Sequence, residues 1–180
     1  MTLSKQEQDM FFQNYFPLLY YASVYEGILP DGSSLEDFYH TSLAQKAASR
    51  DILFKDKSVI KNFKQDNRHF FGNILSVDFV NNVQKGLYGR FAFIKENKMA
   101  AVLYHLDNKK FYEVGAITEP LSKIAPGYPV VIETAIFNFN DKIICDGMIN
   151  QNVLLGKNIA EGFLTEYNDN IKKGQVLKKL

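Results

Sequence analysis

The sequence predicts an α+β fold in which a helical N-terminal part packs with a small antiparallel β-sheet or half-open barrel. Apolar residues in the first 86 positions recur at intervals of three and four, which is typical of amphipathic helices. Beyond residue 89 they alternate with period two, and turn residues recur at short intervals, as in hairpin-linked strands. The helical period returns near residue 159, so we expect a C-terminal helix behind about five strands.

The first helix is expected to start after Ser4. Ser4 and Glu7 form a capping-box pattern, in which each side chain satisfies a backbone amide of the other residue. The apolar positions that follow form one stripe: Phe11, Tyr15, Leu18, Leu19 and Ala22. Pro17 lies within this stripe and is expected to kink or divide the helix, because proline removes one backbone hydrogen bond.

A turn between Gly27 and Ser34 separates this helix from three more. Ser33 or Ser34 can cap a second helix that runs to about Ser49. Weaker helical patterns cover 58–67 and 76–85, and the last of these closes at a glycine.

The alternating region divides into five expected strands. They lie near 90–95, 99–106, 110–117, 130–138 and 142–149. Three of the connections are short and rich in Asn and Asp, which tolerate the left-handed conformations of tight hairpins: Glu96-Asn97, Asp107-Asn108 and Asn140-Asp141. Strands joined in this way should be neighbours, and the sheet should curl into an SH3-like or OB-like half-barrel.

Three further expectations concern the rest of this half. The longer connection 120–129 could hold a single helical turn at Leu121 and Ile124, and it is the best candidate for a rim loop. The terminal helix repeats an apolar residue every four positions from Ile159 to Ile171, and Val176 and Leu177 could add an edge strand. We expect two regions, 1–86 and 87–180, to form one compact unit.

Composition narrows the function classes. The chain has 21 basic and 20 acidic side chains, whereas a protein that neutralises phosphates usually has a basic excess. Its three arginines are Arg50, Arg68 and Arg90. Nucleic acid is therefore an unlikely partner, and the absence of a signal-peptide pattern or long apolar run indicates a cytoplasmic protein without membrane contact.

No catalytic or metal-binding pattern is recognisable, so no cofactor is expected. The single Cys145 excludes an internal disulfide and lies in an apolar strand, where a thiol behaves as a small core residue. No second metal-ligating residue follows His40, His69 or His105 at helical spacing. A histidine without such a neighbour is more often a structural or surface residue than a metal ligand.

Two carboxylates interrupt apolar strands and are candidate binding residues. Glu133 lies within an expected strand, where it is either paired with a cation such as Arg90 or Lys95, or exposed on a binding face. Asp146 precedes a glycine, so it could close a turn or bulge, or face a cleft as a base or ligand. A site that uses both residues is the alternative function for an enzyme or small-ligand protein.

The strand near residue 90 supplies the other candidates. Tyr88, Arg90, Phe91 and Lys95 mix aromatic and basic side chains, as in platforms that stack single-stranded nucleic acid. Aromatic residues at alternating strand positions are more often core, so this is a second alternative function.

The C-terminal half, from about residue 86 to 173, resembles a domain of uncharacterised bacterial proteins. The resemblance rests on short stretches in a fixed order: 110–114, 118–121, 132–135, 142–147 and the helix ending in Lys172-Lys173-Gly174. Some similar proteins end in a SEC-C-type cysteine and histidine tail that implies zinc, but this chain lacks it, so zinc is not carried over. The resemblance implies no reaction and no ligand.

These observations together favour a non-catalytic binding or protein-interaction module. The expected partner is another protein, and the expected recognition surface is the sheet face or the rim loop 120–129.

Overall fold

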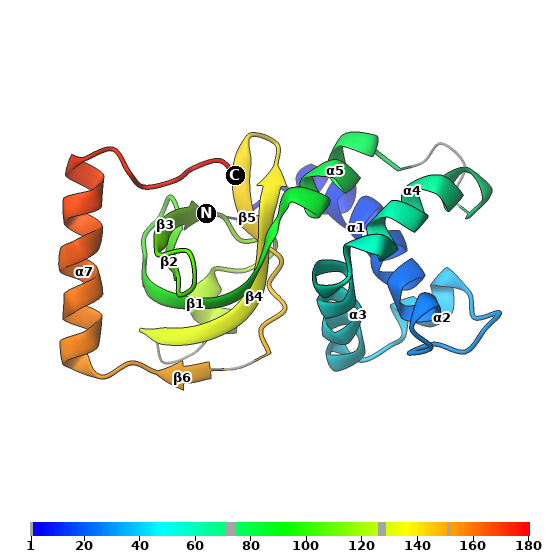
Figure 1. Cartoon of the computed structure of the whole chain (residues 1–180), viewed down its shortest axis with the longest axis horizontal. Coiled ribbons are helices and arrows are strands. Elements are labelled where there is room, and N and C mark those ends of the chain that lie inside the picture. Colours follow the sequence, from blue (N-terminus) through cyan, green and yellow to red (C-terminus); the bar gives the residue numbers. More distant parts are fainter. Residues whose placement is uncertain (1, 71–74, 126–128, 151) are drawn as a thin grey trace. The chain divides into compact units, whose positions relative to one another are not determined.

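A computed structural model describes residues 2–70, 75–125, 129–150 and 152–180, without the side chains of residues 67–70 and 152. The chain divides into two units, described separately below. A helical unit covers Ser4–Gly86, and a barrel unit covers Leu87–Leu180 together with the N-terminal residues as far as Leu3 (Figure 1). That the two regions form one compact unit stays a prediction.

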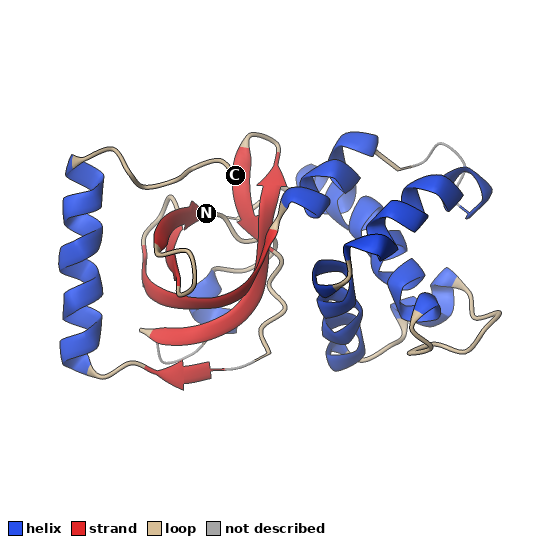
Figure 2. Ribbon diagram, viewed as in Figure 1, coloured by secondary structure: helices blue, strands red, loops and turns tan. Residues whose placement is uncertain are grey.

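The helical unit consists of helices that pack around the first of them (Figure 2). Their bounds are α1 Lys5–Tyr25, α2 Leu35–Tyr39, α3 Leu43–Lys55, α4 Lys57–Phe70 and α5 Val77–Lys85. The expected capping box is present, because Ser4 N donates to Glu7 Oε2 at 2.8 Å and Glu7 N donates to Ser4 Oγ at 3.3 Å. The apolar stripe of α1 is buried throughout, which confirms it as the face that packs on the other helices.

One detail of the helical prediction is wrong, and another is decided in part. Pro17 was expected to kink or divide helix α1, and the helix is not divided there. Pro17 is buried in mid-helix between the buried residues Tyr15 and Leu18. The helix expected to run from residue 34 to about 49 is two helices. Ser42 starts a new capping box with Gln45, so α2 ends at Tyr39 and α3 continues to Lys55.

The antiparallel sheet confirms the expected α+β class and curls into a barrel. The bounds of its strands are β1 Leu87–Glu96, β2 Ala101–His105, β3 Lys110–Val114, β4 Val130–Phe139, β5 Lys142–Cys145 and β6 Asn152–Leu154. The order along the sheet is β3-β2-β1-β4-β5, and β6 pairs with β4. Helices α6 Leu121–Ile124 and α7 Lys157–Lys172 complete the unit, and α6 is the single turn expected between the third and fourth strands.

The two ends of this strand order meet and close the barrel. Gly115, just after β3, donates to Ile143 O at 2.8 Å and accepts from Cys145 N at 2.9 Å, forming a parallel bridge with β5. The circular order is therefore β1-β2-β3-β5-β4, with a helix between β3 and β4. This is the connectivity of the OB fold.

The expected strands differ from the structure mainly at their ends. The third and fifth stop earlier than the alternation suggested, at Val114 and Cys145, and β6 was not predicted. After β5 the chain turns at Gly147, whose φ is +75°, while the Asp146 carboxylate accepts the Met148 amide at 3.1 Å. A side chain that accepts a hydrogen bond from a nearby backbone amide competes with the pairing of that amide in a sheet.

Alternate residues of the strands build two separate cores. The inward side chains fill the barrel and include Phe91, Leu103, Tyr112, Ile132 and Cys145. The outward side chains of β1, β2 and β3 form a second cluster with the apolar face of α7. In this cluster Tyr104 and Phe163 have ring centroids 4.9 Å apart, and Phe111 and Tyr167 have centroids 5.6 Å apart. Helix α7 therefore covers the outer face of these three strands.

None of the helices in the described part of the chain combines the length and the apolar content needed to cross a bilayer.

Candidate functional site

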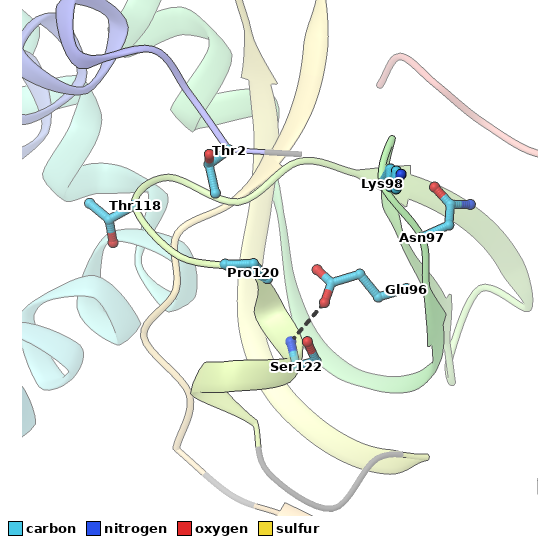
Figure 3. Close-up of a pocket in the computed structure, with 7 residues that line it drawn as sticks. All are labelled: Thr2, Glu96, Asn97, Lys98, Thr118, Pro120 and Ser122. Carbon is cyan, nitrogen blue, oxygen red and sulfur yellow. Dashed lines mark hydrogen bonds between the residues drawn. The ribbon is translucent and has the colours of Figure 1, made fainter.

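The rim of the barrel carries two hollows, one on each side of the β1–β2 turn. The first has a volume of about 510 Å³ and lies between this turn and the start of the β3–β4 connection, which is the first part of the expected rim loop (Figure 3). Most of its lining residues carry a polar side chain, although they also contribute apolar surface: Thr2, Glu96, Asn97, Lys98, Thr118, Pro120 and Ser122.

Glu96 fixes the floor of the first hollow. Its Oε2 accepts from the Ser122 amide at 3.1 Å (Figure 3), and its Oε1 accepts from the Leu121 amide at 2.9 Å. One carboxylate therefore joins the end of β1 to the first turn of α6. Because both oxygens are used by backbone amides, Glu96 is a support for this hollow and is poorly placed as a general base.

The second hollow has a volume of about 470 Å³ and lies at the seam where β3 meets β5. It is lined by the β1–β2 turn, the end of β3, the β4–β5 turn and the C-terminal segment: Asn97, Met99, Ala100, Glu113, Val114, Gly115, Asp141, Lys142, Ile143 and Lys178. The β4–β5 turn is the predicted Asn140-Asp141 pair, and both residues have positive φ, of +45° and +62°. Asn97 lines both hollows, which makes the rim one continuous surface.

Met99 lies at the tip of the β1–β2 turn and is 70% exposed. Asn97 Oδ1 holds the turn by accepting from the amides of Met99 at 2.7 Å and Ala100 at 3.0 Å. A flexible, exposed thioether on a hydrogen-bonded turn is a contact group suited to binding another protein.

The carboxylates of the second hollow are engaged with cations and a phenol. Glu113 Oε1 accepts from the Tyr167 hydroxyl at 3.0 Å, and its Oε2 lies 3.3 Å from Lys178 Nζ. Burial, reinforced by this acidic partner, raises the pKa of Tyr167 to about 12. Asp141 Oδ1 lies 2.7 Å from Lys179 Nζ, and this hydrogen bond and charge hold the pKa of Asp141 below its usual range.

The candidate Asp146 is buried and hydrogen-bonded to its neighbours. Its Oδ1 accepts from the Thr134 hydroxyl at 2.9 Å and from the Met148 amide at 3.1 Å, and only 6% of the residue is exposed. The carboxylate thereby ties β4 to the turn after β5.

The candidate Glu133 lies on the opposite face of β4. Thr134, its neighbour, points inward to Asp146, so Glu133 points outward by the alternation of the strand. Its cross-strand neighbour is Arg90, and the two residues line a small hollow of about 70 Å³ together with Val131 and Val153. The structure therefore does not bring Glu133 and Asp146 into one site, and their roles in binding stay predictions.

The residues of the basic and aromatic strand lie in different surroundings. Phe91 is fully buried in the barrel, and Lys95 Nζ lies 4.6 Å from the ring centroid of Tyr167 on α7. Of the five candidate residues, Arg90 is exposed and Tyr88 is half-buried on the same outward face. Binding through Tyr88, Arg90 and Lys95 stays a prediction.

The remaining residues that could carry chemistry are dispersed. Arg50 is fully buried in the helical unit, where its Nε donates to Asp51 at 2.7 Å, and the side chains of Arg68 and His69 lie outside the described residues. Cys145 is 1% exposed, with its Sγ 3.2 Å from Thr134 Oγ1. In the described part of the chain, no three His, Cys, Asp or Glu side chains gather in a group that could hold a metal ion.

Three rim residues escaped the sequence reasoning: Met99, Glu113 and Lys178. Glu113 alone left a signal, because it interrupts the apolar pattern of an expected strand just as Glu133 does. Met99 and Lys178 come near Glu113 only because the barrel closes and the C-terminal segment returns to it. Neither of these contacts is local in sequence.

Comparison with protein-family models, curated proteins and solved structures finds no match to this chain. The candidate site therefore rests on its geometry alone.

Proposed function

We propose that this protein is a non-catalytic protein-interaction module whose recognition surface is the rim of the barrel. The rim consists of the β1–β2 turn, the two hollows beside it and the β4–β5 turn. The observation that carries the proposal is the exposed Met99, on a hydrogen-bonded turn between two open hollows whose linings mix polar and apolar groups. An apolar contact group with a polar surround matches the anatomy of protein interfaces.

The charges of the rim support binding over catalysis. Glu96 is occupied by two backbone amides, Glu113 by Tyr167 and Lys178, and Asp141 by Lys179. A general base needs a carboxylate or imidazole that faces a substrate with a free lone pair and a matched pKa. These carboxylates instead already have partners within the barrel unit.

The OB connectivity supports the choice of the rim by analogy. In OB barrels the loops between the first and second strands and between the fourth and fifth strands flank the binding surface. In this chain the corresponding turns carry Met99 and Asp141, while the adjoining sheet face is covered by α7. Function does not follow from fold alone, so the analogy supplies only the place to test.

A photo-crosslinking amino acid in place of Met99 tests the proposal in cells that make the protein. We expect discrete adducts with a protein partner, which mass spectrometry can identify. The matched control carries the same amino acid in place of Ile159, which is 57% exposed on α7 of the same unit. Identical adducts from both positions, or none from position 99, would contradict the proposal.

A further inference from the structure

The last seven residues of this chain, Gly174–Leu180, return to the barrel and form a bridge with β3 at Leu177, and we call this segment the tail. The tail returns from α7 toward β5 (Figure 1). Leu177 N donates to Phe111 O at 2.9 Å, and Glu113 N donates to Leu177 O at 2.9 Å, which makes a parallel bridge opposite Tyr112. The tail therefore occupies the edge of β3 that β2 leaves open.

Successive side chains of the tail pack against different parts of the barrel unit. Val176 packs on the outer cluster beneath α7, and Leu177 packs on the inward core of the barrel. The next two residues are cationic and meet the carboxylates of the second hollow: Lys178 pairs with Glu113 at 3.3 Å, and Lys179 pairs with Asp141 at 2.7 Å. Asn138 then exchanges two hydrogen bonds with the backbone of Leu180, at 2.9 and 3.0 Å.

These contacts define the chemistry that the β3 edge accepts. The backbone hydrogen bonds of this edge require an extended peptide. The two apolar clusters accept two successive apolar side chains, and the two carboxylates favour lysine or arginine at the next two positions. This is strand addition, in which main-chain bonds provide affinity and side-chain pockets provide specificity.

The ion pairs are the part of the tail that water reaches most. The side chains of Lys178 and Lys179 are 74% and 65% exposed, and those of their partners Glu113 and Asp141 are 24% and 90% exposed. The Lys179–Asp141 pair therefore contributes little, because water and salt screen it, and a peptide with the same charges can compete for these carboxylates. Gly174, with φ +66°, supplies a turn at which the segment can leave α7.

We infer that the partner of the rim presents an extended basic peptide, which pairs with β3 in place of the tail. This inference rests on the proposed function and names the chemistry of its partner. The tail is then a resident competitor, and a partner binds the intact chain only by displacing it.

A labelled peptide with the sequence of the tail, Gly-Gln-Val-Leu-Lys-Lys-Leu, tests the inference on the full chain by fluorescence anisotropy. In the variant K178E/K179E the tail repels Glu113 and Asp141, so we expect the peptide to bind about tenfold more tightly than to the wild type. Adding Asp141→Asn to that variant should weaken binding again. The matched control is K172E/K173E, which changes the net charge equally, but at the end of α7.

Equal binding to K178E/K179E and K172E/K173E would overturn the inference, because net charge alone would then explain the gain. Equal binding of a peptide with both lysines replaced by glutamate would also overturn it. If the wild-type chain forms dimers and the peptide dissociates them, the segment that pairs with β3 is the tail of a second copy. That result would overturn the inference of a separate partner. Adducts at position 99 without peptide binding would leave the proposed function standing.

Discussion

The contacts of Asp146 predict that this candidate binding residue contributes to stability. The Asp146→Ala variant removes the acceptor of the buried Thr134 hydroxyl and of the Met148 amide. Loss of a buried acceptor costs about 1–3 kcal/mol for each donor affected, and two donors are affected, so we expect the free energy of unfolding to fall by roughly 2–6 kcal/mol. Urea denaturation measures this change.

Glu133 provides the matched control for that experiment, because it points to the outer face of the same strand. Glu133→Ala should change the free energy of unfolding by less than about 0.5 kcal/mol. An Asp146→Ala variant as stable as Glu133→Ala would contradict the structural role of Asp146.

His105 makes the stability of the barrel depend on pH. The imidazole is 6% exposed, and its Nδ1 accepts from the amides of Asp107 at 3.2 Å and Asn108 at 3.1 Å, so the folded state holds it neutral. Burial lowers its pKa below the usual 6.5, and the Asp107 charge opposes this in part. The unfolded chain therefore binds the proton more tightly, and we expect the free energy of unfolding to decline as the pH falls from about 7 to 5.

The variant His105→Asn keeps an acceptor near the same amides but cannot be protonated in this range. Denaturation curves at several pH values should show a shallower decline for this variant than for the wild type. Equal slopes for this variant and the wild type would rule out His105 as the source.

At the scale of elements, Glu96 joins β1 to α6. Glu96→Gln retains one acceptor oxygen and replaces the other with a donor, so one of the two amides at Leu121 and Ser122 loses its partner. We expect the free energy of unfolding to fall by about 1 kcal/mol. Glu119→Gln, on an exposed residue nearby, should leave the stability unchanged, and a similar loss in both variants would contradict the specific role of Glu96.

The elements that the sequence predicted well are those with a local cause. The Ser4 and Glu7 capping box, the Asn140-Asp141 turn and Gly174 after α7 each act within a few residues, and all three are present. The break between α2 and α3 also has a local cause, in Ser42 and Gln45, but the apolar pattern that runs across it hid the signal.

The whole barrel depends on contacts that local patterns do not contain. Gly115 and Ile144 are far apart in sequence, and their pairing turns a curled sheet into a closed one. The same closure assembles the rim from the β1–β2 turn, the end of β3 and the β4–β5 turn. Alternation therefore predicted the strands and their hairpins, whereas the rim as a site required the closure and the position of the tail.

The charge of each unit bears on the nucleic-acid alternative. The region 87–180 has 12 basic and 10 acidic side chains, and the region 4–86 has 9 and 10, so neither has a strong basic excess. We expect a single-stranded oligonucleotide to bind more weakly than about 10⁻⁴ M at physiological salt. A salt titration that gave tight binding with a steep dependence on ionic strength would contradict this prediction.

The N-terminal end of the chain also belongs to the barrel, since Leu3 N donates to Ala116 O at 3.2 Å and to Ile117 O at 3.1 Å. The helical unit is thus an insertion, entered after Leu3 and left before Leu87. If a protease cut the chain between Gly86 and Leu87, each of the two fragments would still contribute residues to the barrel. Removal of the first few residues would therefore destabilise the barrel unit, although most of that unit begins more than 80 residues later in the sequence.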